Sequence, residues 1–75
     1  MSRFLSNLAP GQSGRITHVG GVAEVRNRLL EMGLTQGTRV ELVRVAPLGD
    51  PVELQVRGYR LSVRKSEAST VSIEG

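Results

Sequence analysis

Few side chains in this sequence could carry out chemistry, and they are not grouped. There is one histidine, His18, and there is no cysteine. A transition-metal site needs several nitrogen or sulfur ligands, and His18, Met1 and Met32 do not form such a set convincingly. No motif places a serine and an aspartate beside His18, as nucleophilic catalysis would need. The sequence therefore predicts no catalytic residue, no metal site, no cofactor and no enzymatic activity.

Two kinds of nucleotide recognition can be tested against the residue types. The glycine doublet Gly20–Gly21 lacks the GK[ST] ending of a phosphate-binding loop. Proteins that bind single-stranded nucleic acid stack aromatic side chains on the bases, and the chain has only Phe4 and Tyr59. We therefore expect no nucleic-acid partner, although an arginine face on a small RNA-binding barrel stays open as an alternative.

The pattern of charges favours contact with solvent or with another protein. The formal net charge is +3, and nine of the ten basic residues are arginine. Glutamates alternate with these arginines along the chain, which favours a solvated surface or a charge-complementary protein partner over a phosphate backbone.

One helix must help to position these side chains. No glycine or proline interrupts Val22–Met32, which follows Gly20–Gly21. Its apolar residues recur at helical spacing and predict a core-facing stripe of Val22, Val25, Leu29 and Met32. Glu24 precedes Arg28 by one turn and is expected to pair with it. Gly33 and Leu34 then predict a Schellman end, in which the glycine takes a positive φ.

The rest of the chain alternates with the period of β-strands. A strand with Ile16 inward is predicted in SGRITHV. In TRVELVRV the apolar parity switches after Leu42, which predicts a β-bulge or a sharp bend. The clearest pattern is a hairpin, PVELQVR–YRLSVR, turning at Arg57–Gly58. It should place one apolar row on one face, with the pairs Val56–Tyr59, Leu54–Leu61 and Val52–Val63.

A short helical turn at Ser66–Ser69, with Ser66 as a candidate N-cap, should precede a last strand, TVSI. We expect local ion pairing among Arg64, Lys65 and Glu67. The predicted fold class is mainly β: a small antiparallel barrel of about five strands, with the helix plugging one open end. At 75 residues the chain should form one domain, 1–75. No signal peptide or membrane-spanning run is visible, so we expect a cytoplasmic protein.

Four motifs, in order and spacing, resemble the FeoA family. They are RLLEMGLTQG (Arg28–Gly37), APLGDP (Ala46–Pro51), the hairpin glycine Gly58, and LSVRKSEA (Leu61–Ala68). The resemblance extends from about Leu5 to Ile73. It implies an SH3-like barrel, similar to the C-terminal domain of iron-dependent repressors.

The resemblance also implies a function. FeoA-like proteins accompany FeoB, a membrane protein with a GTP-binding domain that imports ferrous iron, and are thought to contact its cytoplasmic part. They have no consensus iron site, although the family carries the general description of transition-metal ion binding. The implied partner is a FeoB-like transporter, which would hold the chain at the inner face of the membrane. A regulatory domain that binds a peptide segment, as in the repressors, is the alternative.

The candidate contact residues for a partner are Leu48, Arg28, Glu31, Arg57, Arg60 and Arg64. Gly33, Gly37 and Gly58 are assigned to turns. Leu48 is the least expected of these residues, because the turn chemistry of Ala46–Pro51 does not require an apolar side chain. It either caps the barrel mouth, which is the preferred interpretation, or forms an exposed apolar tip.

Overall fold

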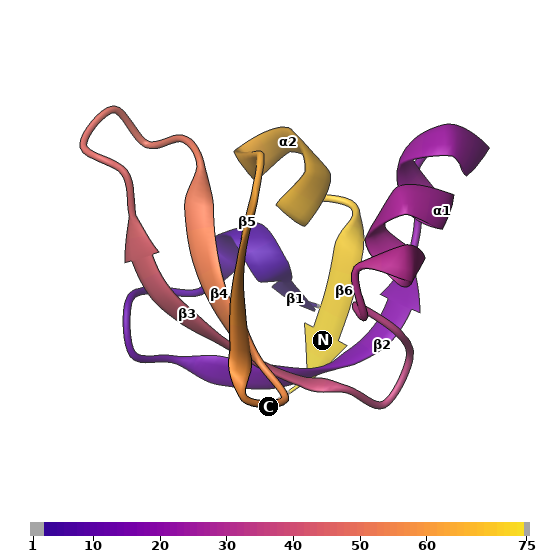
Figure 1. Ribbon diagram of the computed structural model, residues 1–75, viewed down its shortest axis with the longest axis horizontal. Helices are drawn as coiled ribbons and strands as arrows, with labels where there is room; N and C mark the ends of the chain where they lie inside the picture. The colour runs from indigo at the N-terminus through magenta and orange to yellow at the C-terminus, as the bar shows by residue number, and fades with distance from the viewer. Residues whose placement is uncertain (1–2, 75) are drawn as a thin grey trace.

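The computed structural model describes residues 3–74, which form one antiparallel sheet and two α-helices. Met1, considered above as a metal ligand, lies outside the described residues. The sheet has the order β1-β6-β2-β3-β4-β5, and it bends strongly around a single core (Figure 1). The strands are β1 (Arg3–Phe4), β2 (Ser13–Val19), β3 (Arg39–Val45), β4 (Val52–Val56), β5 (Tyr59–Val63) and β6 (Val71–Glu74).

The sheet bends where the register shifts. One shift lies between Ile16 and His18, where β2 pairs with β6. Another lies between Leu42 and Arg44, where β3 pairs with β4. An extra residue on one strand breaks the ladder and increases the local twist. The bulge predicted from the parity switch after Leu42 is therefore confirmed.

The hairpin of β4 and β5 has the predicted register throughout, including Val56 opposite Tyr59 and Val52 opposite Val63. Arg57 has φ 47° and Gly58 has φ 85°, as a two-residue turn with two positive φ angles requires. Tyr59 departs from the buried row, because it is 42% exposed and its hydroxyl donates to the carbonyl of Met32 at 2.6 Å.

Helix α1 (Ala23–Glu31) lies within the predicted segment and ends as expected. The Leu34 N–H donates to the Leu29 carbonyl at 3.1 Å and the Gly33 N–H to the Leu30 carbonyl at 3.0 Å, which is a Schellman motif. The predicted apolar stripe was too wide. Val22 is 68% exposed, because it is the extended N-cap residue rather than part of the helix.

Leu29 is the one fully buried residue of α1, and Val25 and Met32 pack partly against the core. Fewer side chains of α1 therefore pack against the core than the sequence suggested. Figure 1 shows α1 beside β2 and β6, at one side of the bent sheet.

Helix α2 (Lys65–Ala68) begins at Arg64, not at Ser66. The prediction of Ser66 as N-cap is wrong, because the Glu67 carboxylate accepts from the Arg64 N–H at 3.0 Å and satisfies the helix start. A sixth strand, β1, was also missed. Arg3 and Phe4 pair with Ile73 and Ser72 of β6 before the 3₁₀ turn η1 (Leu5–Asn7), and two residues are too short to show a period.

The core is aliphatic. Every strand except β1 contributes side chains to it, although the first residues of β5 do not. Its fully buried members include Leu5, Ile16, Leu29, Leu34, Val40, Leu42, Leu54, Val56 and Val71. The predicted fold class, mainly β with one principal helix, is confirmed. Within residues 3–74, neither helix has the length and apolar character that crossing a membrane requires.

Candidate functional site

The six predicted contact residues do not form one site. Arg28 and Arg64 come together, with Glu67 between them, at the junction of α1 and α2. Leu48 lies in the β3–β4 loop. Arg57 lies at the opposite end of β4, and Arg60 lies on β5. Glu31 is an exposed residue at the end of α1.

The junction of the two helices is built around the Glu67 carboxylate, which is almost buried. Glu67 forms an ion pair with Arg28 and also accepts from the Arg64 N–H. The predicted Glu24–Arg28 pair is therefore wrong, because a carboxylate in a less hydrated setting attracts the guanidinium more strongly than an exposed one. The predicted ion pairing of Glu67 with Arg64 or Lys65 is also wrong, because its charged partner, Arg28, comes from α1. An open depression of about 370 Å³ adjoins this junction.

The β3–β4 loop presents Leu48 to solvent. This side chain is 97% exposed, so the preferred interpretation of Leu48 as a cap over the barrel mouth is wrong. The loop turns away because the Gly49 N–H donates to the Ala46 carbonyl at 2.7 Å, with Gly49 at φ 90°. Asp50–Pro51 is a cis peptide bond. Figure 1 shows the loop projecting beyond the ends of β3 and β4.

The loop is nevertheless held in place at both ends. The Ala46 N–H donates to the Pro51 carbonyl at 3.0 Å, and the Lys65 N–H at the start of α2 donates to Asp50 Oδ1 at 3.0 Å. A depression of about 190 Å³ lies beside the loop, lined mainly by apolar side chains: Leu5, Leu8, Leu42, Val45 and Val52. We name the exposed segment Ala46–Pro51 the Leu48 loop.

Arg57 and Arg60 already have partners on the surface. Arg57 Nη2 donates to Oγ1 of buried Thr38 at 3.2 Å. Arg60 Nε donates to Gln55 Oε1 at 3.2 Å across the hairpin. The geometry of the two turn glycines Gly37 and Gly58, with φ 88° and 85°, agrees with the turns assigned to them.

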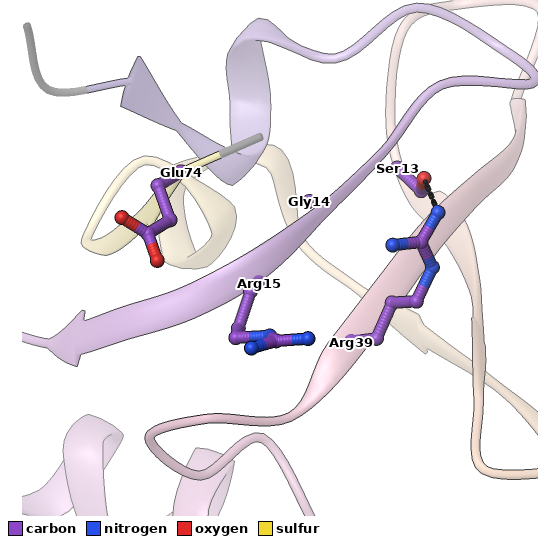
Figure 2. A pocket seen from close by; sticks show the side chains of 5 residues that line it. All are labelled: Ser13, Gly14, Arg15, Arg39 and Glu74. Carbon is purple, nitrogen blue, oxygen red and sulfur yellow. Dashed lines mark hydrogen bonds between the residues drawn. The ribbon is translucent and has the colours of Figure 1, made fainter.

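The structure also shows a depression of about 330 Å³ that sequence reasoning missed, lined by Ser13, Gly14, Arg15, Arg39 and Glu74. Arg15 of β2 lies directly opposite Arg39 of β3, and Arg39 Nη2 donates to Ser13 Oγ at 2.8 Å (Figure 2). Strand register alone brings the two arginines together, so only a prediction of the β2–β3 pairing could have found them. We name this feature the Arg15–Arg39 depression.

Over residues 3–74 there is no group of three or more His, Cys, Asp or Glu residues placed to hold a metal ion. His18 is exposed on β2.

Comparison with known proteins gives a consistent result. The FeoA domain model matches residues 4–75. A fusion protein of Fe(2+) transport protein A and the Fe(2+) transporter FeoB, from Porphyromonas gingivalis, is 37% identical over 93% of this chain. The chain spans 8% of that fusion protein's length.

Solved structures agree in fold. A FeoA-like protein from Clostridium acetobutylicum has a TM-score of 0.90 and 33% identity, over 97% of this chain and 85% of that one. FeoA of Stenotrophomonas maltophilia, solved with zinc and described as a prokaryotic SH3 domain protein, has a TM-score of 0.83 and 30% identity, over 96% of this chain and 89% of that one.

A manganese-dependent transcriptional repressor also superimposes on 99% of this chain and 41% of its own, with a TM-score of 0.88. At 9% identity this similarity shows the fold alone. The predicted SH3-like fold, shared with metal-dependent repressors, is thus confirmed.

Proposed function

The chain belongs to the FeoA family, and from this premise we propose that it is a non-enzymatic accessory protein of bacterial ferrous iron uptake. In this proposal residues 1–75 act as one domain in the cytoplasm and bind the cytoplasmic part of a FeoB-like transporter. The partner would hold the domain at the inner face of the membrane.

The observation that carries the proposal is the fusion protein, in which a relative of nearly the whole chain is joined to a FeoB transporter. Covalent linkage gives two modules a high effective concentration, so even weak contacts between them are occupied. Binding in the absence of such linkage would need a contact surface on the domain that is sufficient by itself.

The Leu48 loop is the best candidate for the centre of that surface. A leucine that is 97% exposed contributes nothing to the folded core, whereas burying it against a partner would be favourable by about 2 kcal/mol. The backbone hydrogen bonds at Ala46 and Lys65 hold the loop before binding, which reduces the entropy lost on association.

Charged residues near α2 would complete the surface. Asp50 accepts from the Lys65 N–H, which brings the loop close to the neighbouring Arg64, and Glu67 joins Arg64 to Arg28. We retain Leu48, Arg64 and Arg28 as contacts. Arg57, Arg60 and Glu31 are left out. Arg57 lies at the far end of β4 and is bonded to Thr38, Arg60 lies near the same end of the hairpin and is bonded to Gln55, and Glu31 lies at the far end of α1.

Binding to the purified cytoplasmic part of a FeoB-like transporter tests the proposal. We expect the chain to co-purify with it, and Leu48→Ser to weaken binding about tenfold while changing stability by less than about 0.5 kcal/mol. Val22→Ser is the matched control, because it also replaces an exposed apolar residue, and serine is a favoured N-cap. Absence of association at micromolar concentrations, with and without guanine nucleotide, would contradict the proposal.

A further inference from the structure

We propose that the Arg15–Arg39 depression is a binding site for a phosphoryl group. The proposal goes beyond the binding of a transporter and does not depend on it. It rests on the register of β2 and β3, on the directions of the two guanidinium groups and on the lack of a carboxylate paired with either of them within residues 3–74.

The register places the two arginines as close as an antiparallel sheet allows. The Ile16 N–H donates to the Thr38 carbonyl and the Leu42 N–H donates to the Gln12 carbonyl, each at 2.9 Å. Hydrogen-bonded pairs alternate with non-hydrogen-bonded pairs, so Arg15 and Arg39 form a non-hydrogen-bonded pair, in which facing Cα atoms are only about 4.5 Å apart. Two like charges directly opposite each other destabilise a sheet.

The neighbouring carboxylates do not neutralise this pair. Within residues 3–74 the ion pairs are Arg28–Glu67 and Arg44–Glu53, and neither includes Arg15 or Arg39. Glu74 lies opposite Arg15 on β6, but Figure 2 shows the Arg15 side chain extending toward Arg39, with the Glu74 carboxylate on the other side of Arg15. The positive charge of the depression is therefore open to an external anion.

Two further contacts prepare the site. The bond from Arg39 Nη2 to Ser13 Oγ orients one guanidinium and leaves its remaining N–H groups available. Arg57, which donates to buried Thr38 next to Arg39, adds positive charge at the same end of the sheet but does not line the depression. This local excess of arginine would attract a dianion more strongly than isolated surface arginines do.

The chemistry favours a phosphoryl group over a carboxylate. One guanidinium fork is enough to occupy both oxygens of a carboxylate, whereas a phosphoryl group has enough oxygens to bind two forks at once. The depression is shallow and has no aromatic or apolar wall among its lining residues, so it suits a terminal phosphoryl group presented at the surface. That group could belong to a free phosphorylated molecule or to a lipid headgroup.

The test is a titration of the folded chain with inorganic pyrophosphate at constant ionic strength, followed by amide chemical shifts. We expect saturable shifts centred on residues 13–15 and 39, and a loss of affinity of about tenfold or more in Arg15→Gln and in Arg39→Gln. Arg26→Gln is the matched control, because it removes the same charge from an exposed position on α1 and should leave affinity unchanged. Glu74→Gln should increase affinity by removing the carboxylate that lines the depression.

Binding to lipid vesicles distinguishes the two sources of the phosphoryl group. Arginine-dependent binding to vesicles that contain phosphatidic acid, but not to phosphatidylcholine alone, would assign the site to a lipid headgroup. Binding to pyrophosphate without binding to these vesicles would assign it to a free phosphorylated molecule.

Shifts that do not saturate, or equal weakening by Arg26→Gln, would overturn the proposal. Because these measurements use the chain alone, their failure would leave the binding of a transporter unaffected.

Discussion

Gly33 shows how one residue can satisfy two separate requirements. Its φ of 98° closes the Schellman end of α1, and the Tyr59 hydroxyl approaches so closely that a Cβ at this position would collide with it. Gly37 has a similar φ of 88°, but open space surrounds the position of its missing Cβ. The sequence indicates the first requirement at both positions. The second depends on β5 lying against the end of α1.

These two glycines give a prediction with an internal control. Gly37→Ala should cost only the strain of a positive φ, about 1 kcal/mol, whereas Gly33→Ala should cost roughly 1 kcal/mol more, because the Tyr59 hydroxyl must also move aside and lose its hydrogen bond to the Met32 carbonyl. In a Tyr59→Phe background the hydroxyl is gone, and the cost of Gly33→Ala should fall to about 1 kcal/mol. Urea unfolding of the single and double variants measures this coupling. Equal costs for Gly33→Ala in both backgrounds would contradict it.

At the scale of elements, α2 depends on a side chain within its own turn and on a neighbouring helix. Glu67 accepts from the Arg64 N–H at the start of α2 and pairs with Arg28 of α1. Four residues form too short a helix to be stable by themselves. The placement of α2, and with it the Lys65 N–H that holds the Leu48 loop, therefore depends on these contacts.

Substitutions in α2 should distinguish the two possible caps. Glu67→Ala removes both the cap and the ion pair, and should lower the free energy of unfolding by about 1 to 2 kcal/mol. Ser66→Ala should change it by less than about 0.5 kcal/mol, because the Ser66 side chain does not cap the helix. Thermal or urea unfolding measures both. A larger loss in Ser66→Ala than in Glu67→Ala would reverse our assignment of the cap.

The β4–β5 hairpin has one face toward the core and one face toward solvent. Leu54 is fully buried at the centre of β4, and the next residue, Gln55, lies on the opposite, partly exposed face. We expect Leu54→Asp to abolish the cooperative unfolding transition, because burying an unpaired charge costs about as much as the whole free energy of unfolding of a small domain. Gln55→Asp should keep the transition. A native melting curve for Leu54→Asp would show that the assignment of faces is wrong.

At the scale of the whole molecule, the two proposed surfaces lie at opposite ends of β3. Arg39 begins this strand and the Leu48 loop follows its last residue, Val45. A strand of this length spans about 20 Å, which exceeds the Debye length of about 8 Å at physiological ionic strength. The depressions at the two ends have no lining residue in common, so no single side chain connects the two sites directly.

Binding at the two surfaces should therefore be independent. Saturating pyrophosphate should leave the affinity for the cytoplasmic part of a FeoB-like transporter unchanged within about twofold at physiological salt. Leu48→Ser should likewise leave the affinity for pyrophosphate unchanged. Competition between pyrophosphate and the transporter, measured by fluorescence anisotropy, would mean that the partner covers both ends of β3.

The sequence by itself determined the features that arise between residues close in the chain. The hairpin register, the bulge after Leu42 and the Schellman end at Gly33 follow from local periodicity and from the φ angles that glycine permits. The four motifs also identified the family. The exposed position of Leu48, the partner of Glu67 and the meeting of Arg15 with Arg39 were decided only by the tertiary structure. Leu48 is exposed because its loop projects beyond the ends of β3 and β4. The two charged contacts join segments whose separation depends on strand register and helix docking, which no local pattern encodes.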